Sequence, residues 1–407
     1  MKKILLSALA ALTLGSVAAN AGVTKLYQDE NGQVYTKAGE GRTLIQTSRT
    51  PVFAKADKLK FSGTTYIGYV YDDYKADTYK TDYKSDTSDF EIRRAYLQLK
   101  AYLLDDPKSY FRITLDTHND GGSWDMRMKY AYLYLNDVFA KTGVEIGLAH
   151  RPWHDYEEHN GWLYRSIAKV MIEDKKSGPD LSNSADYGFL FKTRTQYFDA
   201  DYGVFRGEGY HSSQNVGSFS FEWRATAHLL GTTSHHHPEK HTYFDMSFYG
   251  QYNKGHKEVV VVDPITGMLV TEKQDLIFGA LHTVYNMPSF LIAAQYVKSQ
   301  DTSDIINNIS AQAGSGYSIN AEYRMGSEKE YKLLARYDSW TPDVKVADPV
   351  TGLKVEKENR SYIAGAAWKQ NSNVEWVANV IVTDNEAGSA KEKENGTQYM
   401  LTAEVKF

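Results

Sequence analysis

The clearest pattern along the chain is an alternation of apolar and polar residues with a period of two. It is most regular over residues 218–230, where alternate positions are apolar or aromatic and the positions between them are polar: Phe219, Phe221, Trp223, Ala225, Ala227 and Leu229 against Ser220, Glu222, Arg224, Thr226 and His228. Because successive side chains of a β-strand point to opposite faces, this segment predicts a strand with one apolar and one polar face.

Segments of this kind recur from residue 59 to the end of the chain, separated by turn-forming residues. We expect strands over 59–72, 89–103, 108–118, 125–135, 143–151, 186–198, 202–212, 218–230, 242–253, 273–286, 289–299, 315–325, 329–339, 360–369, 373–383 and 396–407. About sixteen alternating segments of about ten residues each are typical of outer-membrane barrels. The sequence therefore predicts an all-β fold, a transmembrane antiparallel β-barrel over residues 59–407.

The connections between these segments alternate in length. Short turns are expected at 104–107, 199–201, 286–288, 326–328 and 370–372, and long loops at 73–88, 152–185, 254–272, 300–314, 340–359 and 384–395. Short periplasmic turns and long outer loops are the arrangement of outer-membrane barrels, whereas a β-sandwich would not need it.

The longest connection, 152–185, has helix-compatible apolar spacing over residues 162–172. We expect this loop to fold inward and narrow the lumen, with Arg151, Arg165 and Lys169 as the cations of the constriction. An outer flap that does not contact the channel is the alternative.

Both ends of the chain carry features of an exported barrel. Met1 and two lysines precede an apolar run and the small-x-small sequence at 19–21, which predicts a signal peptide over residues 1–21. The polar residues 22–58 predict a periplasmic segment. The last strand ends in Phe407, which resembles the membrane-insertion signal of outer-membrane barrels. We therefore expect the mature protein in the bacterial outer membrane, in contact with its lipids and lipopolysaccharide.

Composition narrows the possible chemistry. The 407 residues include no cysteine, and the formal net charge is −5. The lack of cysteine excludes disulfides, Cys-ligated metals and thiol catalysis. The negative charge gives no reason to expect a nucleic-acid partner, and nothing in the sequence implies a cofactor.

The polar faces of the expected strands should line the lumen, because a charge on the lipid face costs about 2–4 kcal/mol at the membrane midplane. The acidic residues on these faces are Asp116, Glu145, Glu208, Glu222, Asp245, Glu322, Asp338 and Glu404, and the basic ones are Arg94, Lys100, Arg112, Arg127, Lys129, Lys192, Arg194, Arg206, Arg224, Arg324, Lys332 and Arg336. This basic excess predicts a passive channel for small ionic solutes that prefers anions.

The alternatives to a channel are a metal site, a surface receptor and a hydrolase. Three histidines at 235–237 with His241 (His235, His236, His237 and His241) could hold zinc or nickel, but Pro238 places them in a turn, so we expect no metal there. Tyrosine-rich outer loops would suit a surface receptor or adhesin. A barrel hydrolase, which would depend on His228 or His282, is less favoured because no nucleophile motif lies beside the histidines, and we expect no enzyme.

Several short motifs taken together resemble the phosphate-selective porin O and P family of outer-membrane channels. They are the sequences at 90–97 with its arginine pair, 143–152, 186–188, 334–338 and 371–374. The resemblance implies a sixteen-stranded, usually trimeric anion channel. It marks Arg93 and Arg94, and more weakly Arg336, as anion contacts. The long loop 254–272 lacks the arginines with which the family's phosphate channels line their route, so phosphate is one possible anion among others.

Overall fold

The structure is a computed structural model that describes residues 27–29, 34–35, 39–44, 58–74, 85–102, 106–119, 124–211, 217–231, 237–262, 265–301, 312–343, 345–347, 354–389 and 391–407. The chain divides into two units, residues 1–57 and 58–407. In the first unit, β1 (Tyr27–Asp29) pairs with β2 (Val34–Tyr35) and with β3 (Arg42–Leu44) in a small antiparallel sheet. The expected signal peptide, 1–21, lies outside the described residues.

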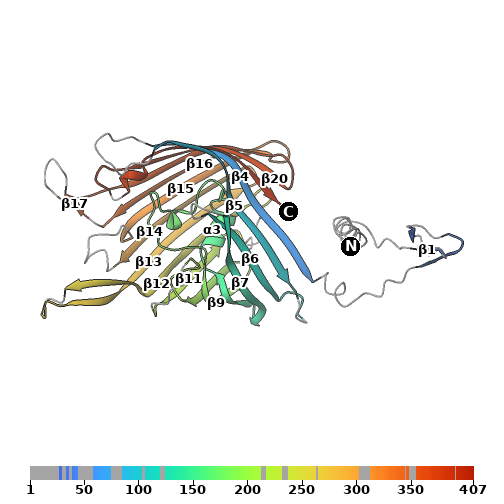
Figure 1. The fold of residues 1–407 in the computed structure, drawn as a ribbon, viewed down its shortest axis with the longest axis horizontal. Coiled ribbons are helices and arrows are strands. Elements are labelled where there is room, and N and C mark those ends of the chain that lie inside the picture. The colour runs from blue at the N-terminus through green and yellow to red at the C-terminus, as the bar shows by residue number, and fades with distance from the viewer. Residues whose placement is uncertain are drawn as a thin grey trace, which may run out of the picture. The chain divides into compact units, whose positions relative to one another are not determined.

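The second unit is a closed antiparallel barrel of sixteen strands, as the alternating sequence predicts (Figure 1). Its strands are β4 (Leu59–Tyr74), β5 (Thr87–Ala101), β6 (Tyr110–Asn119), β7 (Trp124–Phe139), β8 (Thr142–His150), β9 (Ala185–Arg194), β10 (Phe198–Phe205), β11 (Phe219–His228), β12 (Tyr243–Val262), β13 (Leu269–Met287), β14 (Phe290–Asp301), β15 (Gly314–Met325), β16 (Tyr331–Pro342), β19 (Asn359–Lys369), β20 (Val374–Asn385) and β21 (Gly396–Lys406). Pairing of β21 with β4 closes the ring. Among the described residues, no helix has the length and apolar character needed to cross a membrane.

The terminal residue takes part in this closure. The Phe407 backbone N–H donates to the Gly63 carbonyl at 3.1 Å, and the Gly63 N–H donates to the Phe407 carbonyl at 3.0 Å. A closed ring leaves no strand edge, which matters in lipid because no water is there to satisfy free backbone groups.

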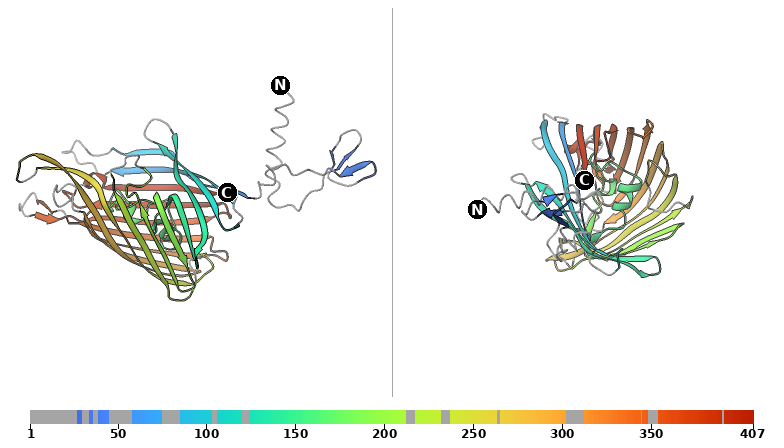
Figure 2. Two further views of the ribbon diagram at one scale, coloured as in Figure 1. Left: turned by 90° about the horizontal axis from the view of Figure 1, so that it is seen from below. Right: turned by 90° about the vertical axis from the view of Figure 1, so that its right-hand side faces the viewer.

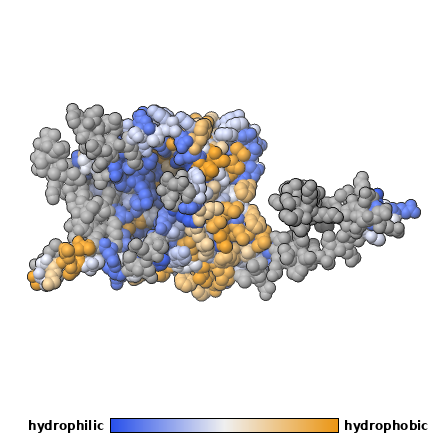
Figure 3. Space-filling model, viewed as in Figure 1, coloured by the Kyte–Doolittle hydropathy of each residue, from blue (hydrophilic) through white to orange (hydrophobic). Residues whose placement is uncertain are grey.

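The short turns and the long loops lie at opposite ends of the barrel (Figure 1). We call these the short-turn end, where the C-terminus lies, and the long-loop end. The outer surface is rich in exposed apolar side chains, such as Tyr317, Ile319 and Tyr323 on β15, while Ser318 and Asn320 on the same strand are buried inside. Figure 3 shows apolar residues gathered over the half of the barrel that carries the C-terminus and hydrophilic residues toward the long-loop end.

Two expectations about connections were wrong. Residues 199–201 are not a turn: they lie within β10, and the turn is at 195–197, where Thr195 accepts from and donates to Phe198. The paired aspartates suggested turn chemistry, but their side chains face the lumen. Most of the expected loop 254–272 is strand, because β12 and β13 stay paired as far as Val262 and Leu269.

Two further expected elements need correction. The predicted strand 202–212 ends at Phe205, so Arg206 and Glu208 lie beyond the barrel wall, where they pair with each other at 2.5 Å. The predicted loop 340–359 contains a short hairpin, β17 (Lys345–Ala347) with β18 (Lys354–Glu356).

Neighbouring residues on β5 test which face meets lipid. Leu97 is exposed on the outside, whereas the Gln98 side chain donates to the Ser62 hydroxyl at 3.2 Å on the inside. We expect Leu97→Lys to reduce the free energy of unfolding by about 1–2 kcal/mol, because it places a charge in lipid between the midplane and the short-turn end. Gln98→Lys, the matched control, should cost far less. Urea titration in lipid vesicles measures both, and equal costs would contradict the assignment of faces.

Candidate functional site

The loop between β8 and β9, residues 151–184, lies inside the barrel, as the view along the barrel in Figure 2 shows. It contains the helix α3 (His154–Asn160) and the single turn η1 (Met171–Glu173). Its apolar side chains are buried in one cluster with lumen-facing residues of β12 to β21: Trp162, Ile167, Val170, Met171 and Ile172 from the loop, and Tyr249, Phe278, Leu334, Trp340 and Met400 from the wall. This packing fills one side of the lumen with apolar side chains.

Specific contacts fix the loop against the wall. The Trp153 ring stacks on the Tyr249 ring at a centroid distance of 3.6 Å. The Tyr156 hydroxyl donates to Asp245 at 2.9 Å, and the Asn320 amide donates to the Gly161 carbonyl at 2.9 Å. These contacts come from strands far apart in the sequence, so the loop is held from several directions.

The three cations expected at the constriction all have acidic partners. Arg151 is buried and donates to both carboxylate oxygens of Glu222, its Nε lying 2.8 Å from one of them. Arg165 pairs with Glu173 at 2.6 Å and with Glu158 at 2.9 Å, and Lys169 pairs with Glu173 at 2.9 Å. Their charges are largely compensated, so these residues hold the loop in its fold.

One carboxyl group of α3 is buried and has no cationic partner within ion-pair distance among the residues that the structure describes. Glu157 accepts from Trp153 at 2.5 Å and from the Gln295 amide at 2.8 Å. Burial raises its pKa to about 7, although Arg336 acts in the opposite direction. Burial also lowers the pKa of His154 to about 3. Near neutral pH, Glu157 is therefore a buried group of α3 whose charge changes.

The loop separates a cavity at the long-loop end from two cavities at the short-turn end. The first has a volume of about 850 Å³, and its lining includes Arg93, Arg94, Arg165 and Arg336. The other two measure about 610 and 390 Å³. They share the lining residues Arg112, His150, Asp155 and His159, and we call them together the short-turn vestibule.

Two β-bulges aim extra basic residues into the lumen. In β5, Tyr66 of β4 pairs with Arg94 and Ile67 pairs with Ile92, so Arg93 is the extra residue. In β7, the extra residue is Lys129. A bulge changes which residues face inward, so consecutive residues such as Arg93 and Arg94 both face the lumen. Strict alternation would place Arg93 on the same face as Ala95 and Leu97, and the bulge is the reason that it does not.

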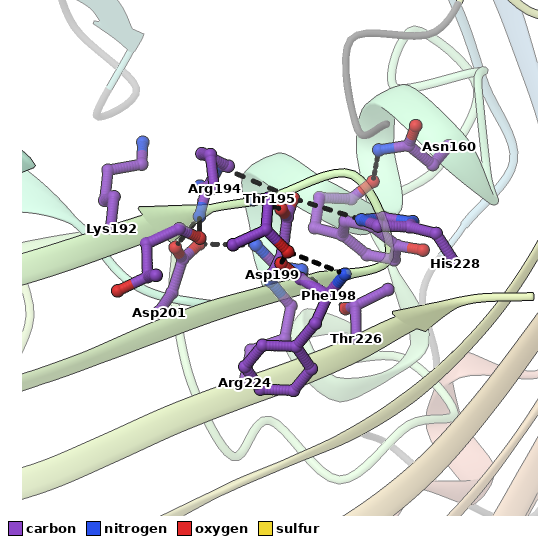
Figure 4. Close-up of polar contacts among 12 residues, drawn as sticks. Asn160, Lys192, Arg194, Thr195, Phe198, Asp199, Asp201, Arg224, Thr226 and His228 are labelled. Carbon is purple, nitrogen blue, oxygen red and sulfur yellow. Dashed lines mark hydrogen bonds and ion pairs between the residues drawn. The ribbon is translucent and has the colours of Figure 1, made fainter. Parts of the chain in front are cut away.

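Most of the predicted wall cations are neutralised by acidic residues. Arg94 pairs with Asp116 at 3.2 Å, and Arg336 pairs with Asp338 at 2.7 Å. Asp201 accepts from Arg224 at 2.7 Å and from Arg194. Figure 4 shows Asp199 and Asp201 beside Arg194, Arg224 and His228. The basic excess of the wall is therefore smaller than the sequence predicts, because Asp199 and Asp201, expected in a turn, lie on the wall beside these cations.

Three of the predicted wall cations have no acidic partner within 4 Å among the described residues. They are Lys100, Arg112 and Lys129, which lie on β5, β6 and β7. Their charged groups lie over tyrosine rings instead: Lys100 over Tyr110 at 4.6 Å, Arg112 over Tyr130 at 4.7 Å and Lys129 over Tyr96 at 4.5 Å. All three line the short-turn vestibule. The uncompensated positive charge of the lumen is therefore gathered on one wall.

The histidines do not form a metal site in the part of the chain that the structure describes, where no three His, Cys, Asp or Glu side chains come together as possible ligands. His235 and His236 lie outside the described residues, and His241 accepts from the His237 backbone at 3.1 Å. His228 is buried between Asp245, at 2.8 Å, and Asp199, at 3.4 Å. His282 is buried where the loop meets the wall, beside the Trp153 ring.

Comparison with solved structures finds the same barrel fold in outer-membrane proteins that include porins. The anion-selective porin of Comamonas acidovorans matches with a TM-score of 0.54 and 12% identity, over 86% of this chain and 98% of that one. OmpF of Salmonella typhi, in complex with daunomycin, matches with a TM-score of 0.55 and 12% identity, over 86% of this chain and 97% of that one. A loop-deletion mutant of OmpT, an outer-membrane protein of Vibrio cholerae, matches with a TM-score of 0.56 and 12% identity, over 86% of this chain and 99% of that one.

At these identities the likeness shows a shared fold, that of the porin barrel. No protein-family model and no curated protein sequence matches the chain. The resemblance to the phosphate-selective porin O and P family therefore stays a prediction.

The buried pair of Arg151 and Glu222 can be tested by removing one charge or both. Arg151→Met leaves Glu222 charged and unpaired, and we expect a loss of about 3–5 kcal/mol in the free energy of unfolding. Arg151→Met combined with Glu222→Met should recover most of that loss, because no lone charge remains buried. Denaturant titration of both variants gives the values, and a double variant as unstable as the single one would contradict the pairing.

Glu157 predicts a pH dependence of stability. Since its folded pKa is raised, its stabilising contribution is present below its ordinary pKa of 4.5 and is lost as the pH rises through about 7. We expect the free energy of unfolding to fall by up to about 3 kcal/mol between pH 5 and pH 8. Glu157→Gln should flatten this change. Thermal unfolding at several pH values measures it, and parallel profiles for the two proteins would disprove the assignment.

Proposed function

We propose that the protein is a passive outer-membrane diffusion channel that prefers small anions. The porin fold supports the channel, and the cavities on both sides of the inward loop support a narrowed aqueous route. The observation that carries the anion preference is the group Lys100, Arg112 and Lys129. These cations have no acidic partner within 4 Å among the described residues, whereas most lumenal cations do.

The physical reason is the contrast between compensated and uncompensated charge. An ion pair produces little field at a distance, so Arg94, Arg224 and Arg336 contribute little to selection between ions. Cations without a counter-charge on a low-dielectric wall raise the local concentration of anions and exclude cations. Asp155 on α3 faces this wall and is half exposed, which limits the preference without reversing it.

The proposal includes the export, the orientation in the membrane, the oligomeric state and the permeating anion. Residues 1–21 direct export, residues 22–58 lie in the periplasm together with the short turns, and the long loops face outward near lipopolysaccharide. The barrel assembles as a trimer, Phe407 supports membrane insertion, and inorganic phosphate is one of the permeating anions. Arg93 and Arg94 in the long-loop cavity are its first contacts.

The reversal potential under a KCl gradient tests the anion preference. In a planar bilayer we expect a discrete conductance with a reversal potential on the chloride side. Replacing Lys100, Arg112 and Lys129 with Gln should move the reversal potential toward the potassium side, with a fall in the chloride-to-potassium permeability ratio of about threefold or more, because the uncompensated field is removed.

A matched control removes three charges elsewhere. Lys108→Gln, Lys141→Gln and Lys298→Gln change exposed lysines outside the lumen wall and should leave the ratio within experimental error. A potassium-side potential for the unmodified protein, or an equal shift in the control, would overturn the proposal.

A further inference from the structure

Three basic residues lie in register across three neighbouring strands at the short-turn end. Lys60 of β4 is the direct partner of Lys100 on β5, and Lys100 is the direct partner of Arg112 on β6. We call Lys60, Lys100 and Arg112 the cation row. Like charges directly opposite each other destabilise a sheet, and no acidic residue among those described lies within ion-pair distance of the row. A bound anion would relieve this repulsion.

The acidic groups nearest the row, Glu145 and Asp155, lie beyond ion-pair distance of it and contact other side chains. Glu145 lies 3.0 Å from Lys192 and 2.8 Å from His150. Asp155, across the vestibule on α3, lies 3.8 Å from His150 and 3.6 Å from His159. These carboxylates lie more than 4 Å from the charged groups of the row, so they offset the repulsion within it only in part.

A row of tyrosines lies directly beside the cation row. Tyr110 and Tyr134 are direct partners on β6 and β7, with ring centroids 5.1 Å apart, and the Tyr102 ring lies 5.3 Å from that of Tyr110. We call these three residues the tyrosine row. Lys60 lies over the Tyr102 ring at 5.2 Å and Lys100 over the Tyr110 ring at 4.6 Å. Charge and aromatic surface are thus adjacent on one wall.

Two members of each row border enough space for a small organic molecule. Lys100, Arg112, Tyr110 and Tyr134 line the same cavity of about 610 Å³. Tyr110 is half-buried rather than enclosed, so part of its ring faces the cavity. An anionic group held by Lys100 and Arg112 would place whatever is attached to it against the tyrosine rings.

From this arrangement we propose that the cation row and the tyrosine row form a binding subsite for carboxylates that carry an aromatic ring. The carboxylate neutralises the opposed charges of Lys100 and Arg112, and the ring packs against Tyr110 and Tyr134 in offset or edge geometry. The proposal rests on the channel function proposed above and specifies one class of solute. Inorganic phosphate would satisfy the cation row but would leave the tyrosine row without a contact.

Block of single-channel current by added solutes tests the subsite. The probes are benzoate, acetate, benzyl alcohol and inorganic phosphate, each added on the short-turn side of the protein in a planar bilayer. We expect benzoate to reach half-block at a concentration about fivefold below that of acetate. This ratio corresponds to the affinity that one aromatic contact adds. Benzyl alcohol should block far more weakly than benzoate.

Three outcomes would overturn the subsite: equal half-block by benzoate and acetate, half-block by phosphate at a lower concentration than benzoate, or block by benzyl alcohol as strong as that by benzoate. Failure of the subsite is distinguishable from failure of the channel proposal, because the KCl reversal potential reads out the channel's charge preference without any organic solute.

Variants separate the two rows. Tyr110→Leu with Tyr134→Leu should raise the concentration of benzoate needed for half-block to that of acetate. Lys100→Gln with Arg112→Gln should raise the half-block concentration of both carboxylates. Tyr323→Leu, on the lipid-facing surface of β15, is the control for loss of a tyrosine and should leave the benzoate advantage in place. Loss of the advantage in this control as well would overturn the assignment, and a discrete open-channel current shows that each variant is folded.

Discussion

The constraint on which the structure depends is that backbone polar groups in lipid must be paired within the protein. The chain meets it by closing sixteen strands into a ring, with the last strand paired to the first and the terminal residue bonded to Gly63. A ring of this size encloses more space than its own side chains can fill. The loop 151–184 occupies part of that space, so the architecture of the site follows from the need to close the sheet.

The filled interior has two chemically different sides. The loop packs apolar side chains against β12 to β21, and this side is held by aromatic stacking and buried hydrogen bonds. On the other side the wall is polar, and ion pairs such as that of Arg224 with Asp201 compensate most of its charge. In the proposed channel, selection between ions therefore depends on a minority of the cations, those whose charged groups lie over tyrosine rings.

The sequence predicted the strands well because a period of two is a local signal, visible within each segment. It predicted less of the site because the partner of a side chain is a long-range property. The residues Asp199 and Asp201 resembled a turn, although they neutralise Arg194 and Arg224 on the wall. The bulge at Arg93 breaks strict alternation. The role of Lys60 could not be predicted, because it depends on the strand register that places Lys100 and Arg112 beside it.

The separation of loop and basic wall has an evolutionary consequence. The width of the route depends on residues 151–184, whereas the uncompensated charge lies on β5 to β7, which precede that loop in the chain. In the proposed channel, pore width and most of the ion preference are thus encoded in different stretches of sequence. Insertions or substitutions in residues 151–184 can alter the permeability to bulky molecules while β5 to β7 keep the ion preference. The two properties can therefore diverge separately between related channels.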